Sequence, residues 1–396
     1  MTRSIRRVFY CCLAMVGIVT AASAADLRIV ESDHYALHTD LDSDLANSIG
    51  QRMDVMWSEY ARRLEDFPLP DRNKKFDVYV FDRKADFVHL TGNRFPNTAG
   101  LFDANNHQLA AFLELQGRDG LRRTLQHEAF HQFADVAVGP NLPVWLNEGL
   151  AQIFEEGIWT GDRFIIGQFP PGRLTRLQAD IAANRLTPFK EFVAMSDEQW
   201  ISDLRDKPRA TTHYNQAWAM AQFLVYAADA DGHPLFVDDL IDMLKLIHHG
   251  VNGQKAFELA FSDNYTNFQI MFEHWVQTIQ PSAQASYLAH QATLAQIMVE
   301  LYGSGQRFNS IDALHNYLRS GGFYLSSENG EFSMAPDAFF CDLTGRWLGP
   351  QQLFLDHRKN ALAPDLVCVP SSDLRMRTHF LMDADALSYE TTIDCP

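Results

Sequence analysis

Long hydrophobic runs and cysteine pairs are scarce in this 396-residue sequence. After residue 24, no run is apolar over the roughly 20 residues that a membrane-spanning helix needs. The five cysteines include no Cys-x-x-Cys spacing, which excludes the usual structural zinc and dithiol redox motifs. Internal repeats and low-complexity linkers are absent as well, so the pattern is that of a globular chain of roughly two domains.

Basic residues are also few in comparison with acidic ones. The chain has 33 Lys and Arg residues against 50 Asp and Glu residues, a formal net charge of −17. Such an acidic surface repels phosphate backbones and anionic lipid headgroups. We therefore expect no binding to nucleic acid and none to a membrane surface.

Residues 1–24 have the pattern of a secretory signal peptide. Three arginines precede an apolar run over residues 8–19, and small residues at 22–24 offer a cleavage site before Ala25. The run is short for a bilayer span, which favours cleavage over a retained membrane anchor. We expect an exported mature chain, periplasmic or extracellular, with no membrane span after cleavage.

Cleavage would remove Cys11 and Cys12 and leave Cys341, Cys368 and Cys395. In an oxidising compartment two of these three are expected to form a disulfide. Cys341 with Cys368 is one of the pairings open to them, and one thiol is left over.

The motif His127-Glu128-Ala129-Phe130-His131 carries the most chemical information. Apolar side chains at helical spacing predict a helix over residues 121–138, which a Gly-Pro pair ends. Histidines four residues apart lie on one helix face, about 5–6 Å apart between Cβ atoms, so both rings can reach one zinc ion. Glu128 would face the same cavity as the general base for a zinc-bound water. The alternative is that the pair are ordinary helix histidines.

Two imidazoles leave a catalytic zinc ion one protein ligand short. Glu148 follows His131 by 17 residues and lies in a second predicted helix, over residues 145–156. Gly and Pro residues at 139–143 allow this helix to return antiparallel to the first. Its apolar neighbours indicate a buried carboxylate, which needs a partner or a metal. A solvated glutamate near a helix start is the alternative.

Together, His127-Glu128-x-x-His131 and Trp145-Leu146-Asn147-Glu148-Gly149-Leu150-Ala151 resemble the gluzincin metallopeptidases, specifically the peptidase-MA-like group of bacterial exported proteins. The resemblance covers about residues 28–280. It implies one Zn²⁺ per chain, with His127, His131 and Glu148 as metal ligands and Glu128 as the catalytic base.

The sequence departs from related zinc classes at several positions. Ala134 and Ala137 stand where a metzincin has a glycine and a third histidine. Gln152 replaces a carboxylate of thermolysin-like members, so we consider Asp135 as the group that orients a ligand histidine, or else as a polar residue on the outer face of the helix. The stretch Gly100-Leu101-Phe102-Asp103-Ala104 lacks the Gly-x-Met-Glu-Asn segment of aminopeptidase relatives, which leaves exopeptidase activity unsupported.

Peptide hydrolysis also needs a hydrogen-bond donor for the oxyanion of the tetrahedral intermediate. The resemblance favours Tyr214 as this second catalytic residue, in a polar stretch that we expect to open a helix over residues 213–228. His213 is the runner-up, and surface or capping roles are the alternative for both.

These patterns and the resemblance predict an α+β fold of the zincin-like metallopeptidase type. The peptidase domain would cover residues 25–302, with a mixed-sheet lobe over about 25–138 and a helical lobe over about 139–302, before a small cysteine-containing α+β tail at 303–396. The expected strands are 35–37, 77–81 and 108–113 in the first lobe and 323–325 and 378–382 in the tail; the other expected helices are 45–67, 234–249, 253–261, 265–280, 283–302 and 311–318.

The apolar part of one of these strands, residues 109–113, directly precedes the motif helix. In gluzincins a strand at this place forms the rim of the cleft, where an extended peptide adds as another strand. The alternative is an interior strand.

The expected function is zinc-dependent hydrolysis of peptide bonds in a peptide or protein substrate. Two alternatives are a zinc amidase acting on cell-envelope peptides and a non-catalytic envelope binding or assembly protein on a peptidase scaffold.

Overall fold

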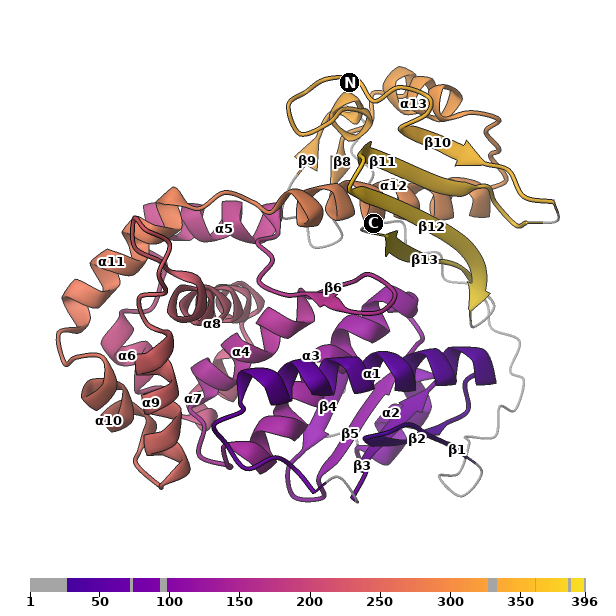
Figure 1. The fold of residues 1–396 in the computed structure, drawn as a ribbon. Helices are drawn as coiled ribbons and strands as arrows, with labels where there is room; N and C mark the ends of the chain where they lie inside the picture. The colour runs from indigo at the N-terminus through magenta and orange to yellow at the C-terminus, as the bar shows by residue number, and fades with distance from the viewer. Residues whose placement is uncertain are drawn as a thin grey trace.

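The structure is a computed structural model that describes residues 27–71, 74–92, 98–326, 333–359, 361–383 and 386–394. The predicted signal peptide and Cys395 lie outside the described residues. Within them the fold is α+β, as predicted (Figure 1). No helix in these ranges has the length and apolar character required to span a bilayer.

A five-stranded mixed sheet forms the base of the N-terminal lobe. Its strands, in spatial order, are β1 (Arg28–Glu31), β2 (Tyr35–Thr39), β3 (Phe76–Phe81), β5 (Gln108–Phe112) and β4 (Gly100–Asp103). Strands β2, β3 and β5 run parallel, and β1 and β4 pair antiparallel at the two edges. The strands predicted in this lobe are thus confirmed, with ends shifted by a residue or two.

Helices cover both faces of this sheet. Alternate strand residues point to opposite faces, so Val78, Val80 and Leu109 belong to the main core with α1 (Ser43–Arg63) and α3 (Gly117–Ala137). Phe81 and Phe112 instead pack with Phe87 of α2 (Lys84–Leu90). Helix α3, which carries the two motif histidines, lies against the sheet and is buried on several sides.

The rim strand differs from the prediction. Strand β5 pairs with β3 on one side and β4 on the other, so it is an interior strand. The edge is β4, which approaches α3 closely because Gly100 has no side chain: a Cβ there would lie 2.5 Å from Cγ2 of Thr124 and 3.1 Å from Cγ of Glu128. The short β4 lacks the apolar alternation that marks a strand in the sequence.

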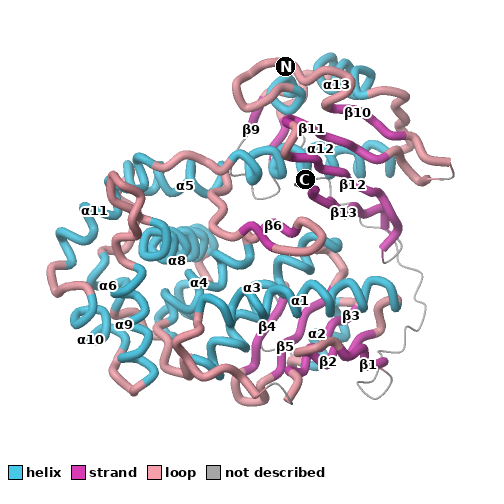
Figure 2. Tube along the Cα trace, in the orientation of Figure 1, coloured by secondary structure: helices cyan, strands magenta, loops and turns pink. Residues whose placement is uncertain are grey.

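The second lobe is mostly helical, as predicted (Figure 2). It contains α4 (Val144–Glu155), α5 (Pro171–Ala182), α6 (Phe189–Val193), α7 (Asp197–Asp203), α8 (Lys207–Tyr226), α9 (Val237–His248), α10 (Gly253–Ala260) and α11 (Tyr265–Thr278), together with the small hairpin of β6 (Ile158–Trp159) and β7 (Phe164–Ile165). Helices α4 and α8 pack so closely at Gly149 that a Cβ there would clash with the carbonyl oxygen of Ala217.

The C-terminal part has a sheet and a core of its own. Its antiparallel sheet has the order β10 (Leu353–Asp356), β11 (Asp365–Ser371), β12 (Leu374–Asp383) and β13 (Ala386–Asp394). With it lie α12 (Ala283–Gly303), α13 (Ile311–Ser320), the hairpin of β8 (Leu325–Ser326) and β9 (Ser333–Met334), and a 3₁₀ turn, η2 (Pro336–Phe340). The predicted boundary at residue 303 falls on the last residue of α12, yet α12 packs on this sheet and contributes to its core.

The suggested disulfide between Cys341 and Cys368 is wrong. Both residues carry free thiols. Cys368 is buried in the tail core, and burial raises the pKa of its thiol to about 12. The hydrophobic core of α12 and the sheet, and not a bond between these two cysteines, holds this part of the chain together.

Candidate metal centre

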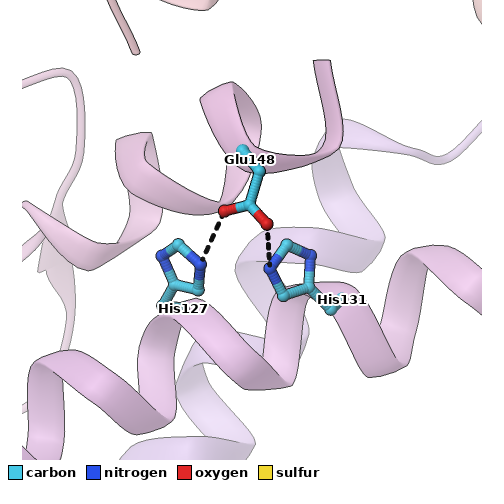
Figure 3. Close-up of side chains that lie close together, drawn as sticks. All are labelled: His127, His131 and Glu148. Atoms are coloured by element: carbon cyan, nitrogen blue, oxygen red, sulfur yellow. Dashed lines mark ion pairs between the residues drawn. The ribbon is translucent and has the colours of Figure 1, made fainter. Parts of the chain in front are cut away.

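Three polar side chains from two adjacent helices meet around one point. His127 and His131 come from neighbouring turns of α3, and Glu148 comes from α4, which packs against it (Figure 3). The Nε2 atom of His127 lies 3.2 Å from Oε2 of Glu148, and Nε2 of His131 lies 3.8 Å from Oε1. One ligand atom from each residue lies within 4.8 Å of the others, so the group could hold a metal ion.

The donor set and its surroundings fit a metal. His131 is 9% exposed, and the buried Oε2 of Glu148 makes no well-aligned hydrogen bond among the described residues, although Nε2 of His127 lies 3.2 Å away. A buried carboxylate oxygen left without a donor is costly, and a cation would compensate it. Two imidazole nitrogens and one carboxylate oxygen form a ligand set that zinc accepts in catalytic sites, with a coordination position left for water.

The outer nitrogens of both histidines are also engaged. Nδ1 of His127 lies 3.0 Å from Oε2 of Glu155, and Nδ1 of His131 lies 2.9 Å from Oδ1 of Asn147. When Nδ1–H donates to these oxygens, each Nε2 presents its lone pair to the ion position.

Sequence reasoning missed both orienting groups. Asp135, which was considered for this role, instead pairs with Nδ1 of His107 at 3.2 Å. Glu155 follows Glu148 by two helical turns, and that spacing puts the two carboxylates on one face of α4, a signal that could have revealed it. Asn147 immediately precedes the ligand, and its contact depends on how α4 is rotated against α3.

Two arginines support the carboxylate behind His127. Arg123 lies 3.4 Å from Glu155 and 2.8 Å from Glu156, which also accepts a hydrogen bond from Arg173 at 3.0 Å. Burial alone would raise the pKa of Glu155, but its hydrogen bond with His127 and the charge of Arg123 lower it to about 2. Within the described residues Gln152 forms no hydrogen bond with His127 or His131: its Oε1 accepts from Arg173 and its Nε2 donates to the main-chain oxygen of Glu148.

Glu128 lies beside His127, His131 and Glu148, and its carboxylate is directed to the edge strand β4. Its Oε2 accepts a hydrogen bond from the main-chain N–H of Phe102 in β4 at 2.9 Å. Burial raises the pKa of this carboxyl above its usual range, although the charges of His127 and His131 oppose the shift. Strand β4, which comes close to α3 at Gly100, thus holds the side chain of Glu128 in place.

Tyr214 and His213 differ in position. Both sit two turns inside α8 and not at its start, because the helix begins at Lys207. Tyr214 lines the cavity beside the ligand group, and burial, followed by the charge of Glu148, raises the pKa of its phenol well above 10, so the phenol remains a donor. His213 is only 2% exposed, and its Nε2 lies 3.1 Å from Oγ1 of Thr187, away from the cavity wall.

His127 of this group and the adjacent Glu128 line a cavity of about 1880 Å³. Its wall includes residues of α3, α4, α8, α12 and β13, so the C-terminal part encloses the same space as the predicted peptidase lobes. A cavity of this size exceeds the roughly 300–1,000 Å³ of a small-molecule pocket and has room for a polymer.

Fold and site together define an α+β protein with a His-His-Glu group able to hold a metal ion. Residues 122–233 match a family described as a protein of unknown function, DUF1570. The matched segment contains the three grouped side chains, Glu128 and Tyr214, and it ends before the C-terminal part. A comparison with curated proteins finds no match.

Proposed function

We propose that this protein is a gluzincin-type zinc metallopeptidase that cleaves peptide bonds in peptides or proteins of an exported compartment. The observation that carries the proposal is the convergence of His127, His131 and Glu148 from two helices, with Glu128 beside them in the wall of a large cavity. These three ligands would hold a zinc ion, which supplies Lewis-acid polarisation of a carbonyl and acidifies a bound water.

The side chains around this group have separate roles in the proposed reaction. Glu128 accepts a proton from the attacking water and returns it to the departing amine. The N–H of Phe102 fixes the carboxylate that does so. Tyr214 donates a hydrogen bond from its phenol to the oxyanion of the tetrahedral intermediate, and its high pKa keeps the proton available.

Strand β4 would set the orientation in which an extended substrate binds. Strand β4 is the outer strand of its sheet and contributes Gly100 to the cavity wall. An extended peptide can pair with such an edge through main-chain hydrogen bonds, which bind any side-chain sequence. The exported location rests on the pattern of residues 1–24.

The test compares the zinc-loaded protein with its Glu128→Gln variant on a library of quenched fluorescent peptides. Removing the base should lower hydrolysis by about 10³-fold or more, while zinc content stays near one per chain. Glu300→Gln is a matched control, because this carboxylate lines the same cavity from α12 outside the ligand group. Full activity in the Glu128→Gln variant would overturn the mechanism.

Two other outcomes separate this proposal from its alternatives. Cleavage of non-peptide amides in cell-envelope peptides, with internal peptide bonds left intact, would indicate an amidase. Tight capture of a protein partner without hydrolysis by the zinc-loaded chain would indicate a binding protein that retains a peptidase scaffold.

A further inference from the structure

Leu115 is an exposed leucine in the wall of the cavity beside the candidate metal centre. It lies between the end of β5 and the start of α3, and it lines the same cavity as His127 and Glu128. Its exposed fraction, 87%, is the highest among the exposed large apolar side chains of the described residues. Single exposed leucines are common on protein surfaces, so exposure alone does not give Leu115 a role.

The backbone at Leu115 supplies an independent observation. Its φ of +69° lies in the left-handed region, which the presence of a Cβ makes unfavourable. The other described non-glycine residues with positive φ are His107 and Asn184, and histidine and asparagine adopt this conformation several-fold more often than most residues. A glycine or an asparagine at position 115 would form the same turn with less strain, so the turn does not account for the leucine.

Hydrogen bonds on both sides fix the turn that contains Leu115. Before it, the main-chain N–H of Glu114 donates to the main-chain oxygen of the first residue after β3 at 2.9 Å. After it, the side-chain amide of Gln116 donates to the main-chain oxygen of Ala99 at 2.9 Å, and its Oε1 accepts from Thr124 of α3 at 2.7 Å. Leu115 is thus held in its exposed position because its neighbours on both sides are bound.

The position of Leu115 at the start of α3 sets its distance from the reacting groups. Gly117 is the first residue of α3 and precedes Glu128 by 11 residues, a separation of about 16 Å along a helix. An extended chain rises about 3.3 Å per residue and covers this distance in about five residues. Ala99, to which the turn is bound, directly precedes Gly100, which lies against Glu128. The start of β4 therefore connects the turn to the metal centre along the cavity wall.

Strand β13 borders the same end of the cavity. Gly117, two residues after Leu115, lies so close to this strand that a Cβ there would be 3.1 Å from Oγ of Ser388. Ser388 and the neighbouring Leu387 also line the cavity. An apolar side chain that entered this end would cover surface of Leu115 that water now contacts, and removal of apolar surface from water is favourable.

We propose that Leu115 is a specificity-determining residue that contacts an apolar side chain of the substrate about five residues from the cleaved bond. Residues in strained backbone conformations are concentrated at sites that contact ligands, and burial by a substrate would offset the cost of holding this leucine exposed. The inference rests on the peptidase function and deepens it, because it names the substrate class. That class is extended polypeptides with an apolar side chain at this distance, not di- or tripeptides.

Three variants separate the leucine side chain from other effects. Leu115→Asn removes the apolar group and suits the left-handed backbone, whereas Leu115→Met keeps an apolar group at the same position. Leu259→Asn is the matched control, because Leu259 is 58% exposed on α10 and lies outside the residues that line the cavity.

The first measurement is hydrolysis of a library of random peptides of about 16 residues by the zinc-loaded protein, with the products identified by mass spectrometry. The parent, Leu115→Met and Leu259→Asn should cleave peptides that are enriched about fivefold or more in large apolar residues at one position, about five residues from the cut. Leu115→Asn should lose this enrichment. The same enrichment with Leu115→Asn, or none among the peptides that the parent cleaves, would overturn the proposal.

Unfolding in urea distinguishes a role in specificity from a role in the fold. Leu115→Asn should unfold at the same urea concentration as the parent or at a higher one, because the exposed side chain has little burial to lose and asparagine adopts the left-handed conformation more readily. A clearly lower midpoint for Leu115→Asn would mean that Leu115 supports the fold, and it would overturn the proposal.

Binding in the zinc-loaded Glu128→Gln background tests the contact without hydrolysis. The probes are two fluorescein-labelled peptides of Gly, Ser and Lys, about 16 residues long, with either leucine or asparagine as one central residue. The leucine peptide should bind about tenfold more tightly, and Leu115→Asn should lower this preference at least about fivefold while Leu115→Met keeps it. An unchanged preference in Leu115→Asn would overturn the proposal.

The two assays also separate this inference from the proposed function. Absence of hydrolysis by the zinc-loaded parent, together with a leucine preference in binding that Leu115→Asn removes, would overturn the peptidase function and leave the contact at Leu115 standing.

Discussion

The Nδ1 atom of His127 lies 3.0 Å from Oε2 of Glu155, a carboxylate that Arg123 and the neighbouring Glu156–Arg173 pair surround. This contact fixes the plane of the His127 ring and turns Nε2 toward Glu148. A carboxylate behind a histidine ligand also makes the imidazole a stronger donor to a metal. Helix α4 thus carries both a proposed metal ligand, Glu148, and the group that orients His127.

Glu155→Gln tests this relationship directly. Loss of the negative charge weakens the hold on His127, so we expect zinc affinity to fall about 10- to 100-fold in a competition assay with a chromophoric chelator. Glu156→Gln is the matched control, because Glu156 pairs with the same arginines. If both variants lost affinity equally, general loss of charge and not the contact to His127 would explain the effect.

The second ligand histidine has a different orienting group. Asn147→Ala should lower zinc affinity to a similar extent, because Oδ1 of Asn147 lies 2.9 Å from Nδ1 of His131. Asp135→Asn should leave it unchanged, since Asp135 pairs with His107 and not with His131. Isothermal titration with zinc measures both, and a larger effect at Asp135 would contradict the geometry.

Tyr214→Phe probes the oxyanion contact. Removal of the phenolic hydroxyl should lower kcat by about 10²-fold and change KM and zinc content little, because the lost hydrogen bond forms mainly in the transition state. Burial keeps the pKa of Tyr214 well above 10, so the phenol stays protonated up to pH 10. The dependence of activity on pH on the alkaline side should therefore be the same in the Phe variant as in the parent. Unchanged kcat would remove Tyr214 from the mechanism.

The sequence was sufficient where short-range patterns determine the structure. The helical spacing of apolar residues around His127 and His131, and the Gly and Pro residues before Glu148, predicted two antiparallel helices with their ligands facing each other, and α3 and α4 have that arrangement. Strands β2, β3 and β5 of the first sheet were predicted from local patterns as well, whereas the edge strands β1 and β4 were not.

Features that depend on how separate elements pack could not be predicted in this way. Whether Asp135 or Asn147 reaches His131 is decided by a rotation of α4 against α3, which no local pattern encodes. The sheet order makes β4 the edge, although its four residues are too few to show alternation. The contribution of β13 to the cavity depends on contacts between Arg122 and Glu390, residues separated by most of the chain.

The close packing of α4 on α8 gives a final prediction, for Gly149→Ala. A Cβ at this position would clash with the main-chain carbonyl of Ala217, and backbone cannot move aside as a flexible side chain would. We expect a loss of about 1–3 kcal/mol in the free energy of unfolding in urea.

Zinc affinity should fall as well in Gly149→Ala, since Glu148 is the adjacent residue and shifts with the helix. Gly303→Ala is the control: no atom lies within 4 Å of a Cβ there, and the change should stay within about 0.5 kcal/mol. Wild-type stability together with wild-type zinc affinity in the Gly149 variant would mean that α4 has freedom to move, and the position of Glu148 would then not depend on α8.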